Sequence, residues 1–486
     1  MFDAEGKKGY DKRDPFWEVK RMKRFVALLV MAALLAAAWI VPGCAEGVEI
    51  RISGDYQYSL MEDGSVRLEK YLGEAEELAV PATLEGRAVT AVADQAFSWC
   101  DCLVSVTLPE GIERLGSRAF AYCAFLESVS LPASLRSVGA NPFVSCEELT
   151  QILLPEGHPY LALKDGVLFS LEDHRLVTFP LALRAKKYQA PEGTEIIGAY
   201  ALYGCDRLAA VSLPDSVTTL ETGAFTLCDK LQRINLPDNV SFLGAEAFSG
   251  CTALAAIHVP AKVSALSESV FEKCTSLTEV ILHSGISFIG EKAFYRCKNL
   301  ASITLPPNVT VLSTSVFGEC ESLTEIDLPA RLTIIGNGAF AGCSALKAAK
   351  LPDTVKFIGA NAFYLCKSLA DLKLPKSLYD IGDYAFHGCI SLPSLDLPAG
   401  LGVIRQGAFE LCASLAEITL PEGVREIQSQ AFQYCVVLRS ATLPGSLETI
   451  AEDAFFQCPA LVCSAPAGSK ALEVCAELGI SCTVTQ

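Results

Sequence analysis

Cysteine recurs along this chain at intervals of 23 residues, and this spacing constrains the fold more than any other feature. Fifteen of the 20 cysteines obey it, in a group of three followed by a group of twelve. They are Cys100, Cys123 and Cys146, then Cys205, Cys228, Cys251, Cys274, Cys297, Cys320, Cys343, Cys366, Cys389, Cys412, Cys435 and Cys458. Such a period predicts tandem repeats that stack into a solenoid, because one repeat cannot bury its apolar face alone.

The repeat has a constant internal pattern, shown by residues 323–343, LTEIDLPARLTIIGNGAFAGC. The Leu-x-x-Ile-x-Leu-Pro core predicts a strand whose Ile and Leu face inward and which ends at the proline. A second short extended segment, residues 332–335, follows. Gly336 and its equivalents Gly116, Gly244, Gly290, Gly359 and Gly382 are expected at a tight corner with positive φ. The Gly-x-x-Ala-Phe-x-x-Cys stretch is then expected to form one helical or 3-10 turn, with Ala and Phe inward.

This repeat resembles the bacterial surface leucine-rich repeats of the BspA-like class, also called the Treponema pallidum type. A phenylalanine precedes the cysteine by three residues in almost every copy, and a leucine follows it by three in all of them. The resemblance covers residues ~78–482. It implies an α/β repeat solenoid, a right-handed leucine-rich-repeat superhelix of short parallel strands with single helical or 3-10 turns, capped at both ends.

Breaks in the period divide the chain into four parts. They are residues 1–45, a signal peptide or lipoprotein signal; residues 46–85, an N-terminal β leader that caps the first turn; residues 86–462, the solenoid; and residues 463–486, a C-terminal cap whose short helix begins after Ser469 as N-cap. The solenoid is interrupted at about residues 156–190, which resemble a β-hairpin excursion found in this family.

The N-terminal segment predicts export. Basic residues at positions 20–24 precede an uncharged run of 17 residues, Phe25–Val41, which small residues follow. An uncleaved membrane anchor is the alternative, since this length is at the lower limit of a spanning helix. Met22 begins a typical signal, so we hypothesise that residues 1–21 are an over-extended start. Two processing routes stay open: lipidation of Cys44 within a lipobox-like sequence, or ordinary cleavage that releases a soluble product.

The cysteine spacing argues against metal and disulfide chemistry in the repeats. Zinc sites need clustered cysteines, whereas these cysteines occur once per turn. Equivalent cysteines on stacked turns point their Cβ atoms in parallel, which disfavours a disulfide. We therefore predict a column of buried thiols. Cys463, Cys475 and Cys482 lie in the predicted cap, where one pair can bridge, and we favour Cys463–Cys482 on adjacent strands.

Composition and motifs exclude several functions. The formal net charge of −17 disfavours nucleic acid and anionic lipid as main partners, so contact with a membrane is expected only through the signal or a lipid anchor. The five histidines occupy unrelated positions and are expected to be surface polar residues. There is no nucleophile elbow, phosphate-binding loop or metal-ligand spacing. We expect no cofactor, no metal and no enzymatic activity.

A binding function would lie on the outward positions of the predicted strands. These positions are mostly small and hydroxyl-bearing, without an aromatic stripe, and one charged cluster stands out: Glu325, Asp327, Lys350 and Lys373. Members of the resembling family are associated with adhesion to host matrix proteins and to other microbes, so the resemblance implies an exported protein that binds a protein ligand. The alternative is a structural envelope scaffold or spacer without a discrete ligand.

Overall fold

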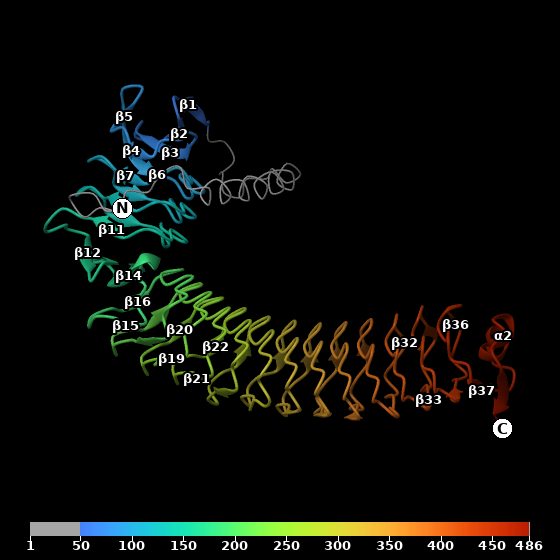
Figure 1. The fold of residues 1–486 in the computed structure, drawn as a ribbon. Coiled ribbons are helices and arrows are strands. Elements are labelled where there is room, and N and C mark those ends of the chain that lie inside the picture. The colour runs from blue at the N-terminus through green and yellow to red at the C-terminus, as the bar shows by residue number, and fades with distance from the viewer. Residues whose placement is uncertain (1–48, 486) are drawn as a thin grey trace, which may run out of the picture. The chain divides into compact units, whose positions relative to one another are not determined.

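The computed structural model describes residues 49–485. The predicted signal and Cys44 lie outside these residues. Arg51–Gln486 forms one compact unit, and its turns succeed one another along the chain in Figure 1. The predicted leucine-rich-repeat solenoid is confirmed, with two short strands in most turns and little helix.

Two parallel ladders run through the stacked turns, and we call them the first and second ladder in the order in which each turn visits them (Figure 1). The first ladder consists of β4 (Glu77–Ala79), β7 (Ser105–Thr107), β9 (Ser128–Ser130), β11 (Gln151–Leu153), β15 (Lys187–Gln189), β17 (Ala210–Ser212), β19 (Arg233–Ile234), β21 (Ala256–His258), β23 (Glu279–Ile281), β26 (Glu325–Asp327), β28 (Ala348–Lys350), β30 (Asp371–Lys373), β33 (Glu417–Thr419), β35 (Ser440–Thr442), β37 (Val462–Pro466) and β38 (Cys482–Thr485).

The second ladder consists of β6 (Arg87–Val92), β8 (Arg114–Leu115), β10 (Ser137–Val138), β14 (Arg175–Thr178), β16 (Ile196–Ile197), β18 (Thr219–Leu220), β20 (Phe242–Leu243), β22 (Ala265–Leu266), β24 (Phe288–Ile289), β25 (Val311–Leu312), β27 (Ile334–Ile335), β29 (Phe357–Ile358), β31 (Asp380–Ile381), β32 (Val403–Ile404), β34 (Glu426–Ile427) and β36 (Thr449–Ile450). Pairing in both ladders joins residues 23 positions apart in the regular part, for example Glu325 with Ala348 and Ile334 with Phe357.

The first ladder is interrupted after β11, β19, β23 and β30, and at the last of these breaks a proline removes one hydrogen bond. The amides of Ala370 and Ala416 donate to carbonyls of the preceding turns, Lys347 O and Pro393 O, at 3.0 and 3.2 Å. Pro393 occupies the equivalent place in the turn between them. Because proline has no amide hydrogen, this rung cannot form.

The N-terminal strands form an antiparallel meander that continues into the second ladder. β1 (Arg51–Ser53) pairs with β2 (Tyr56–Leu60), and β2 pairs with β3 (Val66–Tyr71). The turn between β2 and β3 places Gly64 at φ +80°, where Asp63 Oδ1 accepts from Ser65 N at 2.9 Å. β3 then pairs in parallel with the C-terminal part of β6. The two-residue strand β5 (Thr83–Leu84) pairs antiparallel with the first residues of β6.

The break in the period contains further antiparallel strands. β12 (Leu161–Lys164) pairs with β13 (Val167–Ser170), β13 with β14, and β14 rejoins the second ladder through β16; the 3-10 helix η1 (Leu181–Leu183) follows. Adjacent residues of β13 face different parts of the core: Leu168 packs with the N-terminal turns, whereas Val167 and Phe169 pack with the turns that follow. The hairpin therefore forms a wall between two parts of the core.

His158, in the same break, is buried rather than on the surface as the sequence led us to expect. Its side chain is 6% exposed, with Nε2 3.0 Å from Pro132 O. Its Nδ1 accepts hydrogen bonds from Tyr160 N and Leu161 N at 3.2 and 3.0 Å. The imidazole thus satisfies backbone groups that the irregular turn leaves without strand partners.

The segment that leads to each register cysteine is a run of turns, not the helical or 3-10 turn that we predicted. The residue before the cysteine has a positive φ in all fifteen repeats, for example Glu319 at 56°. Because the backbone reverses here, every second amide points toward the following turn of the solenoid. Phe317 N donates to Ala339 O at 2.9 Å, and Glu319 N donates to Ala341 O at 2.6 Å. A continuous helix would direct these amides into its own carbonyls, so the stack would lose these bonds.

The corner glycines are also required for a different reason from the one predicted, because Gly290 and Gly336 do not have positive φ. A Cβ built on Gly290 would lie 2.6 Å from Glu268 N and Ser267 C, and one on Gly336 would lie 2.5 Å from Leu312 O. Both distances are shorter than any tolerable contact with backbone atoms. These positions select glycine because the preceding turn passes too close for a side chain.

Stacked phenylalanines fill the core beside the thiols. From Phe225 to Phe455 the rings of consecutive turns lie 5.2–5.8 Å apart, with interplanar angles of 3–21°. Phe97, Phe120 and Phe143 continue the same arrangement in the N-terminal turns. Each ring thus buries its faces against its neighbours, which couples adjacent turns directly.

The register cysteines form the predicted buried, unpaired column: thirteen of the fifteen are buried, and Cys100 and Cys458 are partly exposed. In thirteen turns the Sγ donates to a carbonyl 26 residues earlier, at 3.0–3.3 Å. Cys320 illustrates this contact: its Sγ is 3.2 Å from Phe294 O, which also accepts Cys297 N at 3.1 Å. The thiol therefore satisfies the second lone pair of a buried carbonyl.

The C-terminal cap contains α2 (Lys470–Glu477), the one α-helix of residues 49–485. Its apolar side packs Ala471, Val474 and Cys475 into the core. Ser469 occupies the N-cap position, but its hydroxyl makes no capping bond and is buried without a partner. β38 then pairs in parallel with β37 and is the last strand of the first ladder.

We predict that Phe340→Ala destabilises the solenoid locally by about 3–5 kcal/mol, because it removes a fully buried ring from the stack. Hydrogen exchange measured by mass spectrometry should show lost protection in the turns around Phe340 and unchanged protection in β2 and β3. Loss of protection along the whole chain at once would contradict this nearest-neighbour coupling.

We also predict that the buried thiols make the fold sensitive to alkali. Burial raises the pKa of Cys343 from 9.0 to about 12, so between these values the unfolded chain binds fewer protons than the folded one. The free energy of unfolding should then fall as pH rises above about 9, by about 1.4 kcal/mol per pH unit for each such thiol. Denaturant titrations from about pH 8 to about pH 10 measure the slope, and Cys343→Ala should reduce it by one thiol. An identical slope in that variant would count against the prediction.

Candidate functional site

The outward positions of the first ladder form an exposed face of regularly spaced side chains. In each three-residue strand the central residue is inward and the flanking residues are outward, as in β26, where Ile326 is 4% exposed between exposed Glu325 and Asp327. Because the strand length and the 23-residue period are constant, outward side chains repeat in straight rows across the turns.

The structure brings the four sequence-predicted binding residues together on three neighbouring strands. In β26, β28 and β30, Asp327 pairs in register with Lys350, and Lys350 with Lys373. Glu325 lies two residues before Asp327 on β26, at the other outward position of the same strand. All four are exposed, and in the described part of the chain no hydrogen bond or ion pair engages their side chains. Their charges are therefore available to a partner.

A row of carboxylates that the sequence analysis missed passes through this cluster. Glu279, Glu325, Asp371 and Glu417 occupy the first outward position of every second turn and are all exposed. The turns between them carry Ser302, Ala348 and Ser394 at the same position, and Ser440 follows Glu417. Glu325 and Asp371 are two strands apart, or about 10 Å, which limits repulsion between like charges. The signal was in the sequence, as one acidic residue every 46 positions.

The second ladder carries a different exposed row, which is apolar. Phe242 and Phe288 are each 50% exposed and Ile334 is 37% exposed at the outward position of β20, β24 and β27. Ala265, Val311 and Phe357 occupy the turns between and after them. The predicted binding face included only the outward positions of the first strand in each repeat, so the sequence analysis missed this row on the second strand. Exposed apolar rows of this kind are candidate contact surfaces.

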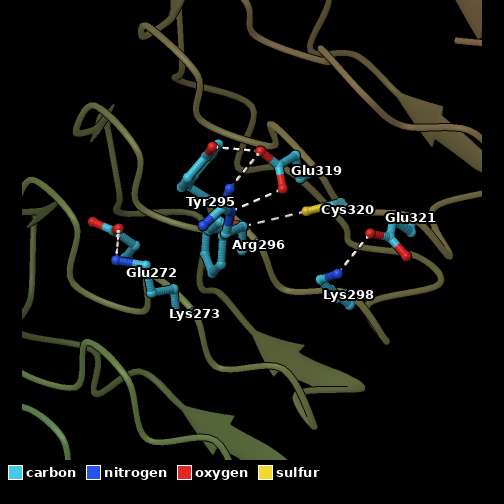
Figure 2. A network of polar contacts seen from close by, with 9 residues as sticks. Glu272, Lys273, Tyr295, Arg296, Lys298, Glu319, Cys320 and Glu321 are labelled. Atoms are coloured by element: carbon cyan, nitrogen blue, oxygen red, sulfur yellow. Dashed lines mark hydrogen bonds and ion pairs between the residues drawn. The ribbon is translucent and has the colours of Figure 1, made fainter. Parts of the chain in front are cut away.

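A charged network lies where the turn segment leads into the register cysteine (Figure 2). Arg296 Nε donates to Glu319 Oε2 at 2.8 Å and Arg296 Nη2 to Oε1 at 3.1 Å, and Tyr295 Oη donates to the same Oε1 at 2.5 Å. Lys298 forms an ion pair with Glu321 at 2.8 Å, which joins the same two turns as the contact between Arg296 and Glu319. The hydrogen bonds from Arg296 lower the pKa of Glu319. These contacts cross between successive turns, so they stabilise stacking and leave no unpaired charge for a ligand.

The cap cysteines Cys463 and Cys482 are register partners on β37 and β38, and Cys475 lies on α2 against them. All three are free thiols in the structure.

No group of three or more His, Cys, Asp or Glu side chains among residues 49–485 is placed to hold a metal ion. Within the same residues, no helix is both long enough and apolar enough to span a bilayer.

Comparison with known proteins agrees with this geometry. The family model for the BspA type leucine-rich repeat region matches six copies, over residues 80–165, 178–301, 266–379 and 333–462, which is more than half of the chain. The chain belongs to the BspA-type leucine-rich-repeat family. Repeats of this family typically form protein-interaction scaffolds rather than enzymes.

Solved structures of bacterial leucine-rich-repeat proteins are similar to this BspA-type chain. A leucine-rich repeat protein from Bacteroides ovatus is 26% identical, with a TM-score of 0.55, over 87% of this chain and 100% of its own. A leucine rich cell surface protein from Faecalibacterium prausnitzii is 24% identical (TM-score 0.37; 89% and 98% covered). The T. pallidum leucine rich repeat protein is 25% identical (TM-score 0.26; 52% and 91% covered). A comparison with curated proteins gives no match.

For the charged network we predict that Glu319→Gln destabilises the chain by less than about 1 kcal/mol at neutral pH, because both partners are partly exposed. The lowered pKa means that the stabilisation is present above the ordinary carboxyl value and disappears as pH falls through the folded one. Thermal midpoints of the two proteins should therefore converge in acid. Glu291→Gln, at an exposed carboxylate, is the control and should not shift the midpoint. A larger loss that persists in acid would show that the side chain acts through packing instead.

Proposed function

We propose that this BspA-type protein is an exported, non-enzymatic scaffold that binds a protein partner through the first-ladder face between β23 and β33. The observation that carries the proposal is the row of exposed carboxylates together with Lys350 and Lys373, none of which is engaged within the described chain. Charged side chains without intramolecular partners are solvated in the free protein, and because their desolvation is costly, a complementary group adds specificity and association rate more than affinity.

The spacing and sign of these charges describe the partner. Glu325 and Asp371, about 10 Å apart, suit basic side chains that are displayed at a similar interval on a protein surface. Lys350 and Lys373 lie beside them and suit an acidic group, so the face discriminates against a uniformly basic polymer. The rigid ladder holds all of these groups at fixed intervals, which lowers the entropic cost of binding.

Export and anchoring are parts of the same proposal. The basic and apolar N-terminal segment supports export, and the Faecalibacterium neighbour is described as a cell surface protein. We propose an extracellular location, with lipidation of Cys44 or release after cleavage as the two forms. Matrix or other cell-surface proteins are the partners that fit an adhesive role.

We expect Glu325→Lys/Asp371→Lys to weaken binding to a responsive extracellular-matrix protein by roughly tenfold or more, mainly through slower association. Biolayer interferometry against an immobilised panel of matrix proteins, at low and moderate salt, measures the loss. The matched control Glu268→Lys/Glu291→Lys makes the same charge change at exposed positions outside the first ladder.

Each outcome of this experiment shows which surface, if any, binds the partner. Equal effects of the two double variants would mean that net charge alone determines binding and would contradict the proposed face. Loss of binding with Phe242→Ser/Phe288→Ser, but not with the charge variants, would move the site to the second ladder. Absence of binding across the panel would favour the structural scaffold.

A further inference from the structure

Three thiols of the C-terminal cap lie together outside the 23-residue register. Cys463 is on β37, Cys475 on α2 and Cys482 on β38. Cys463 and Cys475 are completely buried in the same core, whereas Cys482 packs against that core and is partly exposed. The cluster therefore has one thiol that an external reagent can reach and two that it cannot.

Backbone hydrogen bonds hold the three elements against one another. Cys463 N donates to Ser481 O at 2.8 Å, and Ile480 N donates to Cys475 O at 2.8 Å. The helix α2 that carries Cys475 packs against both β37 and β38, which carry Cys463 and Cys482, and the Cys475 thiol interacts with both of these thiols. Cys475 is thus the central member of the cluster, and each of the other two is its neighbour.

These thiols differ from those of the repeat column in the groups that surround them. Thirteen of the fifteen column thiols donate to a carbonyl one turn away, as Cys343 does to Phe317 O at 3.1 Å. Among the described residues, neither Cys463 nor Cys475 has a hydrogen bond from its thiol to a carbonyl, and both interact with other thiols. Hydrogen bonding from Cys463 lowers the pKa of Cys475, whereas burial raises that of Cys343; in the column Cys228 also has a lowered pKa, but it is buried and donates to Leu202 O. A lower pKa increases the thiolate fraction, which is the nucleophile in disulfide exchange.

The register of the strands argues against the pair that the sequence favoured. Cys463 and Cys482 are directly opposite in a parallel pair, so their Cβ atoms point the same way. A disulfide needs Cβ atoms that approach each other. Cys475 comes from the helix that packs on these strands, so its Cβ does not run parallel to theirs, which removes this obstacle.

We propose that the cap is a thiol-oxidation site in which Cys475 is the shared disulfide partner and Cys482 is the point of entry. A disulfide oxidant, R–S–S–R, is attacked by Cys482 Sγ, which forms a mixed disulfide and releases one R–SH. Cys475 Sγ then attacks Cys482 Sγ, forms the Cys475–Cys482 bond and releases the second R–SH. The cap loses two hydrogens and two electrons, and the oxidant gains them. Exchange with Cys463 can move the bond to Cys463–Cys475 without further oxidation.

Either bond attaches α2 covalently to the last strands of the first ladder. An oxidising environment outside the cell would supply this reaction, but the inference depends only on the cap geometry and not on the identity of a binding partner. Column thiols such as Cys343 remain reduced because they are buried, parallel and hydrogen bonded to carbonyls.

The experiment treats the folded full chain with oxidised glutathione, blocks free thiols under denaturing conditions, and maps disulfides by non-reducing peptide mass spectrometry. We expect a linked peptide that contains Cys475 joined to Cys482 or Cys463, with a mass about 2 Da below the sum of its parts. Cys343 should remain alkylated as a reduced thiol and is the internal control.

Single Cys→Ser variants identify the central thiol. Cys475→Ser should abolish every intramolecular cap disulfide and leave glutathione attached to Cys482. Cys463→Ser should retain the Cys475–Cys482 bond, and Cys482→Ser should slow oxidation severalfold or more by removing the exposed entry thiol. A Cys463–Cys482 bond in Cys475→Ser would overturn the proposal. The unmutated chain provides a test free of any folding defect: a fully reduced cap after treatment would overturn it as well.

Discussion

The hydrogen bond from the register cysteine to a carbonyl of the preceding turn, made in thirteen of the fifteen repeats, is the contact on which the stack depends. The phenylalanine carbonyl already accepts the amide of its own cysteine, so a buried lone pair remains, and the next thiol satisfies it, as Cys320 does for Phe294. An alanine would fill most of the space but donate nothing, and a larger side chain would not fit beside the stacked rings. Cysteine combines small size, apolar character and a weak donor, which accounts for its recurrence.

Close approach of the turns imposes two further constraints. At corners that carry glycine, such as Gly290, a Cβ would meet backbone atoms of the turn before it, whereas other turns accept Ser267 or Gln428 at the equivalent position. The residue before the cysteine must adopt positive φ, so that alternate amides reach the next turn, and residues as large as Glu319 accept this conformation. The strain at each such residue is offset by a hydrogen bond between turns. Side chains that project outward escape both requirements, so they can vary without disturbing the stack.

The outward positions are therefore where this protein can acquire specificity. The first ladder has an alternating carboxylate row with two lysines beside it, and the second ladder has Phe242, Phe288 and Ile334. The turn side differs again, because its charges, such as those of Arg296 and Glu319, pair with each other across turns. One repeat thus provides three faces with different chemistry.

The sequence by itself determined the repeat, its strands, the inward phenylalanines and the buried thiols, because a side chain repeated in every turn must occupy the same environment in every turn. It also identified Glu325, Asp327, Lys350 and Lys373 as outward residues. It did not determine the turn conformation, the reason for the glycines, the burial of His158 or the central place of Cys475. These depend on how closely neighbouring turns approach and on which backbone groups lack partners. Only the stacked tertiary structure decides such distances.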